Sequence, residues 1–157
     1  MQAYVAIIGP GSGATDSDRA FAREAARRLA GAGMVIVTGG LDGVMGAAAE
    51  GCAAAGGTSV GLLPGRDRAA GHPALSVTIA TGLGELRNGL VVRSADCVLA
   101  VGGSWGTTSE LALALRTGVP VVSLHGWPLP DDPGLHLAHD VDDAVAQVED
   151  LVRRTHA

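Results

Sequence analysis

The stretch Tyr4–Ala14 reads YVAIIGPGSGA, an unbroken apolar run followed by a turn that contains three glycines. An apolar run without alternating polar residues is typical of a strand that is buried on both faces of a parallel sheet. Glycines directly after such a strand permit the sharp turn that leads into a helix. The stretch therefore predicts the first strand and turn of an α/β protein.

The same alternation of short apolar runs and longer helical segments continues along the chain. Strands are predicted at Tyr4–Ile8, Met34–Val37, Ser59–Leu63, Leu75–Ile79, Cys97–Val101 and Pro120–Leu124. Helices are predicted at about 16–32, 43–55, 83–94, 107–117 and 141–155. From this order we expect a single α/β domain over residues 1–157, a doubly wound parallel sheet of about six strands with helices on both faces.

The charged residues argue against several classes of protein. All 11 basic residues are arginine, and lysine is absent. Schiff-base chemistry, pyridoxal-phosphate chemistry and the phosphate-binding loop of P-loop enzymes all require a lysine, so none of them is expected. The formal net charge of −5 opposes nucleic-acid binding, because nucleic-acid-binding proteins carry basic surfaces.

Neither a metal nor a resident cofactor is expected. Cys52 and Cys97 lie far apart in apolar surroundings and form no CxxC pair, which predicts buried thiols. His136 and His139 have helical spacing, but their neighbours indicate a loop and favour exposed imidazoles over a metal site. The start Met1–Tyr4 lacks the basic region of a signal peptide, and no apolar run reaches the roughly 18 residues of a membrane span. We therefore expect a cytoplasmic protein.

Two predicted helical segments, Gly43–Ala55 and Leu111–Leu115, are apolar on nearly all sides. A helix without a polar face must be covered on both sides. We therefore expect a homo-oligomer, most simply a two-fold homodimer. Arg19, Arg23 and Arg27 form a stripe on the first helix, for which a solvated face is favoured over an anion site.

Ligands of open parallel sheets bind beyond the carboxyl ends of the strands, where the sequence predicts three glycine-rich loops. The first loop offers Gly11 and Ser12 as ligand contacts, within a weak dinucleotide-binding pattern. A dinucleotide site also requires an acidic residue at the end of the second strand, and the segment Val37–Gly40 has none. NAD binding is therefore not expected.

The second loop leads directly into a helix. Glycines there allow the backbone to approach a ligand closely. Its candidate contacts are Gly39, Gly40, Gly43 and Met45. Gly46 lies inside the helix, where glycine is unfavourable by about 1 kcal/mol relative to alanine, so a packing or ligand reason is expected. For Asp42 in this loop, solvation is favoured over a polar contact to a ligand.

The third loop opens a helix and combines glycines with hydroxyl side chains. Free N–H groups and the positive end of the helix dipole make it the strongest candidate for binding a phosphate. Its candidate contacts are Gly102, Gly103, Ser104, Gly106, Thr107 and Thr108. Glu110 has two interpretations of equal weight, since it is either a functional carboxylate or the partner of Thr107 in a capping box.

The residues of the second and third loops, together with Arg87, resemble the LONELY GUY (LOG) family, long mislabelled as lysine decarboxylases. The matching patterns are Gly39-Gly40-x-x-Gly43-x-Met45-Gly46, Arg87 and Gly102-Gly103-x-x-Gly106-Thr107-x-x-Glu110. The resemblance covers nearly the whole chain. It implies a dimeric, Rossmann-like nucleotide-binding domain that hydrolyses the N-glycosidic bond of a nucleoside 5′-monophosphate to free base and ribose 5-phosphate. The family's catalytic arginine and glutamate fall on Arg87 and Glu110.

The sequence departs from the family pattern in two respects, the last motif and the residue after Arg87. The proline that opens the last motif is Val101, and one more residue precedes Gly106 than in the short form of that motif. The lysine that follows the family's arginine is Asn88, which we add to the candidate phosphate contacts. An Arg-Asn pair with this loop is similar to the molybdenum-cofactor carrier proteins of the same superfamily, which bind a pterin phosphate without turning it over.

Two hypotheses of different class follow. In the first the protein is an enzyme, in which Glu110 stabilises the positive charge on the ribose or orients the attacking water. Arg87 then holds the phosphate or the leaving group. In the second the same site binds a phosphorylated nucleotide or pterin and leaves it intact. A third hypothesis, a DNA-processing relative, is disfavoured by the net charge. Trp127 and the Pro-Leu-Pro that follows are interpreted only as a rigid loop.

Overall fold

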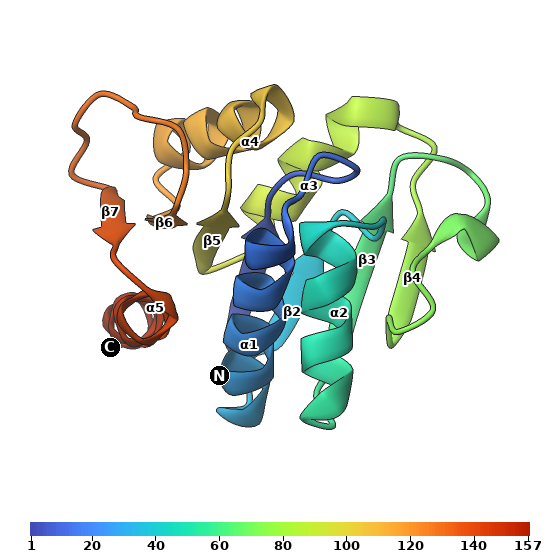
Figure 1. Ribbon diagram of the computed structural model, residues 1–157, viewed down its shortest axis with the longest axis horizontal. Helices are drawn as coiled ribbons and strands as arrows, with labels where there is room; N and C mark the ends of the chain where they lie inside the picture. The colour runs from blue at the N-terminus through green and yellow to red at the C-terminus, as the bar shows by residue number, and fades with distance from the viewer.

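The computed structural model describes residues 1–157, which form one sheet of seven parallel strands in the order β4-β3-β2-β1-β5-β6-β7 (Figure 1). The strands are β1 Tyr4–Ile8, β2 Val35–Thr38, β3 Ser59–Leu63, β4 Val77–Ala80, β5 Cys97–Val101, β6 Val121–Leu124 and β7 Leu135–Ala138. The predicted parallel α/β sheet is confirmed, and six of its strands overlap the predicted runs. The seventh, β7, lies in the segment around His136 that we predicted as a loop.

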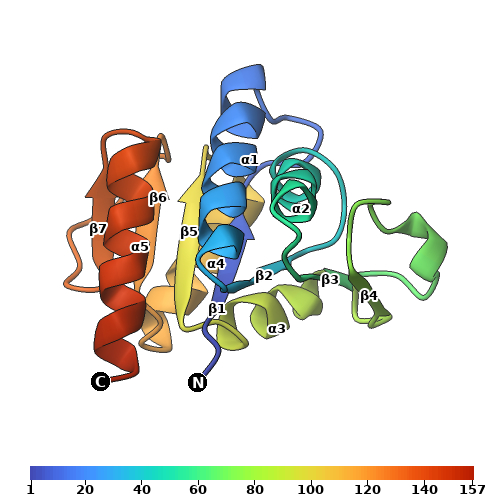
Figure 2. The same cartoon turned by 90° about the horizontal axis from the view of Figure 1, so that it is seen from below.

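Five helices cover the two faces of the sheet. Three of them lie on one face and two on the other, which gives three layers (Figure 2). The first three are α1 Asp16–Gly31, α2 Val44–Ala54 and α5 Val141–Thr155. The other two are α3 Arg87–Arg93 and α4 Trp105–Arg116. The helix predicted from residue 83 begins instead with a 3₁₀ turn, Gly84–Leu86, before α3.

Each central strand contributes to two separate cores because successive side chains of a strand point to opposite faces of the sheet. In β1, Val5 and Ile7 pack under α1, α2 and α5, whereas Ala6 and Ile8 pack under α3 and α4. All four side chains are at most 2% exposed. This explains why β1 appears in the sequence as an unbroken apolar run.

Helix α2 is covered within the chain itself. It packs against α1, and a Cβ atom at Gly51 would lie 1.9 Å from the carbonyl oxygen of Arg23. The apolar surface of α2 is therefore buried between α1 and the sheet, and our inference that it packs on a second subunit is wrong for this helix. Cys52 of α2 and Cys97 of β5 are buried free thiols, as predicted. No helix is both long and apolar enough to cross a membrane.

The order of the strands identifies where a ligand is expected. From β1 the chain adds β2, β3 and β4 on one side, and it later adds β5, β6 and β7 on the other. The direction of winding therefore changes between β1 and β5. In open parallel sheets the crevice at such a change, outside the carboxyl ends of the strands, is the usual ligand site.

Candidate functional site

A cavity of about 160 Å³ lies at this point, between the loops that follow β1, β2 and β5. We call it the switch-point cavity. It is lined by Ile8, Gly9, Gly11, Gly39, Met45, Arg87, Asn88, Ser104, Gly106, Thr107 and Glu110. Nine of these eleven residues are among the contacts that the sequence suggested, and the nine come from three loops and three helices. The structure therefore brings Arg87 and Glu110 together at the same cavity.

The floor of the cavity depends on close approaches between backbones. A Cβ atom at Gly9 would lie 2.3 Å from the carbonyl oxygen of Val101, so only glycine fits between β1 and β5. Gly43 has φ of +71°, and a Cβ atom there would lie 2.1 Å from the oxygen of Gly11. The amide of Val44 donates to the oxygen of Pro10 at 3.0 Å. The loops after β1 and β2 thus form one interlocked unit.

Helix α4 presents its N-terminus to the cavity. Ser104 is the N-cap, and its Oγ accepts a hydrogen bond from the amide of Thr107 at 3.1 Å and lies 2.8 Å from the Thr107 hydroxyl. The amide of Thr108 donates to the carbonyl oxygen of Ser104. Trp105 and Gly106 are the first two residues of the helix, so their amides have no acceptor within it. An anion at this end would receive these two donors and the positive end of the helix dipole.

The capping-box interpretation of Glu110 is wrong. Because Ser104 is the N-cap, α4 begins two residues earlier than the sequence suggested, and Glu110 lies in the second turn of the helix. Its carboxyl is buried at the cavity instead of capping the helix, since only 8% of the residue is exposed. Burial raises the pKa of Glu110 to about 7, and the positive charge of Arg87 opposes this shift in part.

Arg87 is a buried cation without a carboxylate partner. It is the first residue of α3 and is 8% exposed. Its Nη1 donates to Oδ1 of Asn88, whereas its buried Nε has no hydrogen-bond partner. Burial lowers the pKa of Arg87, and the nearby Glu110 raises it less strongly. A buried guanidinium with an unused donor is unfavourable unless an anion completes its hydrogen bonds.

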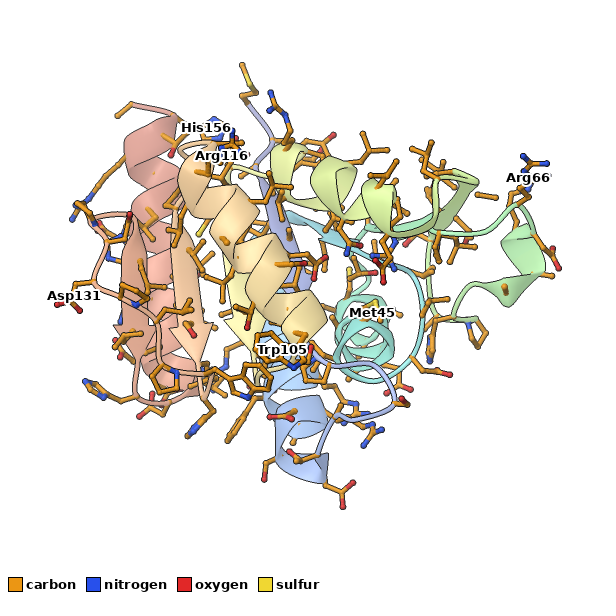
Figure 3. The ribbon with its side chains drawn as sticks, turned by 90° about the horizontal axis from the view of Figure 1, so that it is seen from above. Met45, Arg66, Trp105, Arg116, Asp131 and His156 are labelled. Atoms are coloured by element: carbon orange, nitrogen blue, oxygen red, sulfur yellow. The ribbon has the colours of Figure 1, made fainter.

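The guanidinium lies against Gly39, where a Cβ atom would be 2.7 Å from Nη2 of Arg87 and 2.7 Å from Sδ of Met45. Any larger residue at position 39 would displace both side chains. The sequence suggested Gly39 as a ligand contact, and the structure adds this reason for a glycine there. Figure 3 shows Met45 on α2 and Trp105 at the beginning of α4.

Six predicted contacts do not line the cavity. They are Ser12, Gly40, Gly43, Gly102, Gly103 and Thr108. Ser12 is exposed. The glycines support the loops: Gly40 and Gly102 have positive φ, and Gly103 lies directly under the indole of Trp127.

Two further predictions are settled by packing. Gly46 makes room for the ring of His72, which would lie 2.7 Å from a Cβ atom at position 46, so the reason for this glycine is packing. Asp42 is exposed and lies outside the cavity, 4.0 Å from His72. Sequence reasoning did not select Ile8 and Gly9 as lining residues. Their position at the carboxyl end of the predicted first strand is the sequence signal that could have identified them. Nowhere do three His, Cys, Asp or Glu side chains gather so as to hold a metal ion.

The geometry can be compared with known proteins. A model of the SLOG cluster4 family matches residues 2–153. The chain belongs to the SLOG cluster4 family. This SLOG cluster4 protein is also 38% identical over 120 residues to an uncharacterized protein of Archaeoglobus fulgidus, covering 76% of this chain and 78% of the relative.

Two solved structures are similar over almost the whole chain. The molybdenum cofactor carrier protein of Chlamydomonas reinhardtii superposes with a TM-score of 0.91 at 34% identity, covering 98% of this chain and 99% of that protein. The molybdenum cofactor binding protein of Rippkaea orientalis superposes with a TM-score of 0.90 at 31% identity, covering 97% and 98%. The suspected resemblance, a LOG-like Rossmann fold close to the molybdenum cofactor carrier proteins, is thereby confirmed.

Proposed function

We propose that this SLOG cluster4 protein binds the molybdenum cofactor, a pterin that carries a phosphate, and releases it unchanged. The observation that carries the proposal is Arg87, a buried cation whose Nε has no partner at the switch-point cavity. The similarity to two proteins named for carrying or binding this cofactor supports the identity of the ligand.

The proposed phosphate site combines three kinds of donor. The guanidinium of Arg87 supplies charge, the amides of Trp105 and Gly106 supply the helix N-terminus, and the hydroxyls of Ser104 and Thr107 complete the site. Gly11, Gly39, Met45 and Asn88 form the remaining wall. A protonated Glu110 carboxyl adds no negative charge, so it does not repel the phosphate.

The size of the cavity supports binding of the phosphate alone within it. Its volume of about 160 Å³ is smaller than the roughly 300–1,000 Å³ of sites that enclose a drug-sized ligand. The organic part of the ligand would therefore lie outside the switch-point cavity.

Hydrolysis of a nucleoside 5′-monophosphate is the second candidate function, because Arg87 and Glu110 line the same cavity. Such a reaction needs a carboxylate to stabilise positive charge on the ribose. A pKa of about 7 leaves Glu110 only partly ionised at neutral pH. The carrier function does not require this carboxylate, and we therefore favour it.

One experiment distinguishes the two functions. The protein is incubated with a pterin monophosphate and, separately, with each common nucleoside 5′-monophosphate, and the small molecules are then analysed by mass spectrometry. We expect intact pterin monophosphate bound to the wild type, and we expect Arg87→Ala to weaken this binding about 10- to 100-fold, the effect of a lost charged hydrogen bond. Release of free base by the wild type, but not by Glu110→Gln, would contradict the carrier function.

We also propose that the protein is a homodimer through the outer surface of α3 and α4. Leu86 and Trp105 are 79% and 81% exposed, and Leu90 is 44% exposed. Leu86, Trp105 and Leu113 line a groove of about 700 Å³ that adjoins the switch-point cavity. Exposed apolar patches of this kind mark protein interfaces. Of the apolar segment of α4 that the sequence singled out, Leu113 belongs to this patch, whereas Leu111 and Ala114 are buried in the core.

A further inference from the structure

The largest cavity of the molecule lies outside the proposed phosphate site. It measures about 780 Å³ and runs along the loop between β6 and β7. We call it the β6–β7 cavity, and its lining includes His125, Trp127, Leu129, Asp131, Asp132 and His139. A volume of this size is within the roughly 300–1,000 Å³ typical of small-molecule sites. Figure 3 shows Asp131 on this loop, at the outer side of the sheet.

The beginning of this loop is held in one conformation. His125 has φ of 56°, which is unusual for a residue with a side chain, and its ring stacks on Phe21 of α1 with centroids 5.1 Å apart. A Cβ atom at Gly126 would lie 2.5 Å from Oγ of Ser123. A strained conformation of this kind persists only where its surroundings fix it, and it is typical of ligand-binding loops.

Trp127 connects this loop to the phosphate site. A Cβ atom at Gly103 would lie 2.3 Å from Cδ1 of its indole, so Trp127 packs directly on the backbone that leads to Ser104. Its indole also meets Trp105, the first residue of α4, edge to face at 5.1 Å. Trp127 therefore borders the β6–β7 cavity and also rests on the loop that is proposed to hold phosphate.

The two indoles are unusually exposed for their size. Trp127 is 43% exposed and Trp105 is 81% exposed, in a chain with only four aromatic residues of the Phe, Trp and Tyr type. Exposed indole surface is unfavourable in water, and it is recovered when a planar ring stacks on it. The exposed surface of Trp127, the indole that lines the cavity, therefore favours a flat heterocycle as the occupant.

The charged side chains of the cavity indicate which edge of a bound ring would face them. Asp131 and Asp132 are its only carboxylates, and no arginine lines it. Asp132 already accepts a hydrogen bond from the amide of Gly134 at 2.8 Å, while the exposed Asp131 makes no hydrogen bond. A free carboxylate repels phosphate but accepts two parallel N–H donors. The 2-amino-4-oxopyrimidine edge of a pterin presents such a pair of donors, whereas adenine does not.

We propose that the β6–β7 cavity is a second binding site, which holds a planar 2-amino-4-oxopyrimidine ring stacked on Trp127 and bound at its N–H edge by Asp131. This inference rests on the proposed function, because it assigns the pterin ring of the same ligand to this cavity and its phosphate to the switch-point cavity. Trp127 and Asp131 then determine which ring is accepted, and Arg87 determines that a phosphate is required.

The test uses tryptophan fluorescence, since the chain has only two tryptophans. In Trp105→Phe the remaining indole is Trp127, and we expect a pterin monophosphate to quench its emission. Trp127→Ala and Asp131→Asn should each weaken pterin monophosphate binding, measured by calorimetry, at least tenfold, while inorganic phosphate binds as to the wild type. Arg87→Ala should abolish inorganic phosphate binding and leave weak binding of an unphosphorylated pterin. Asp16→Asn, which removes an exposed carboxylate on α1, is the control for the charge change.

The outcomes separate this inference from the proposed function. If Trp127→Ala and Asp131→Asn bind the pterin monophosphate as tightly as the wild type while Arg87→Ala does not, the ring lies elsewhere and the inference is overturned. If the wild type binds neither the pterin monophosphate nor the unphosphorylated pterin, both proposals fail. If it binds the unphosphorylated pterin through Trp127 but binds no phosphate, the ring site stands and the carrier function fails. Thermal unfolding of each variant establishes that it is folded.

Discussion

Glu110 and Arg87 are the two titratable side chains of the switch-point cavity, and burial acts on both of them. Burial disfavours the charged form of each group, while their mutual attraction opposes this effect. For Glu110 the balance leaves the pKa at about 7, so that the carboxyl is neutral in mildly acidic solution. Arg87 remains the cation of the pair. The cavity therefore becomes more positive as the pH falls through 7.

Glu110 also makes the stability of the fold depend on pH. Its folded-state pKa of about 7 exceeds the usual 4.5. The contribution of Glu110 to the free energy of unfolding is therefore complete below pH 4.5 and is lost as the pH rises to 7. We expect Glu110→Gln to be more stable than the wild type by about 3 kcal/mol at pH 8 and equally stable at pH 4.5. Urea denaturation at both pH values measures this, with the exposed Glu85→Gln as the control. An equal difference at the two pH values would refute it.

The same titration controls the binding of anions. Sulfate keeps its charge in this range and is therefore a better probe than phosphate. Binding to the cavity should be accompanied by uptake of a proton at Glu110, so we expect sulfate affinity to fall by up to about tenfold for each pH unit above 7. Calorimetry at pH 6, 7 and 8 tests this. Glu110→Gln should bind sulfate equally at all three values, and a wild type that does so as well would contradict the assignment of the proton to Glu110.

At the scale of the elements, the N-terminus of α4 is positioned by Ser104, which the sequence offered only as a phosphate contact. Loss of an N-cap hydroxyl typically lowers the free energy of unfolding by about 1 kcal/mol. We expect this loss for Ser104→Ala. Ser109→Ala is the matched control, because its Oγ only donates to the Gly106 oxygen on the exposed face of the same helix. Chemical denaturation measures the free energy of unfolding of the two variants. Equal losses of this free energy would show that Ser104 does not cap α4.

The interlocked loops after β1 and β2 give a second prediction at this scale. Gly43 and Gly56 both have positive φ, but only a Cβ atom at position 43 would overlap another backbone. Gly56→Ala should therefore lower the free energy of unfolding by about 1–2 kcal/mol, the conformational effect alone. Gly43→Ala should lower it further and weaken anion binding, because the loop of Gly11 must move. Equal effects of the two variants on stability and binding would refute the interlocking.

Some elements could be predicted from the sequence and others could not. Strands buried on both faces, such as β1 and β5, are unbroken apolar runs and were predicted at their observed places. Strand β7 lies at the edge, is only partly buried and contains His136, so its four residues give no such signal. The start of α4 was misplaced because Ser104 and Thr107 are both acceptable N-caps, and only the backbone conformation distinguishes them.

The candidate site was partly visible in the sequence. Glycine-rich loops after three strands indicated where a ligand binds, and the resemblance singled out Arg87 and Glu110. The missing partner of Arg87 Nε and the pKa of Glu110 depend on which groups surround them in space, which spacing along the chain does not reveal. The same holds for Trp127, whose contact with Gly103 joins residues 24 positions apart.

For the whole molecule, the exposed leucines of α3 and its preceding turn lead to a prediction about assembly. We expect the wild type to sediment as a dimer and Leu86→Glu/Leu90→Glu as a monomer, because two buried charges without partners oppose association. Leu137→Glu is the control, since Leu137 is 68% exposed on β7, away from this surface. Analytical ultracentrifugation distinguishes the states. A double variant that still forms a dimer would place the interface elsewhere.

Arg87 is the residue through which we propose that a phosphorylated pterin is held, at the change of winding between β1 and β5. The most direct test is calorimetric titration of the wild type and Arg87→Ala with a pterin monophosphate. We expect saturable binding with one ligand for each chain in the wild type, and binding at least tenfold weaker in the variant. Absence of binding to the wild type, or equal affinity of the two proteins, would contradict this proposal.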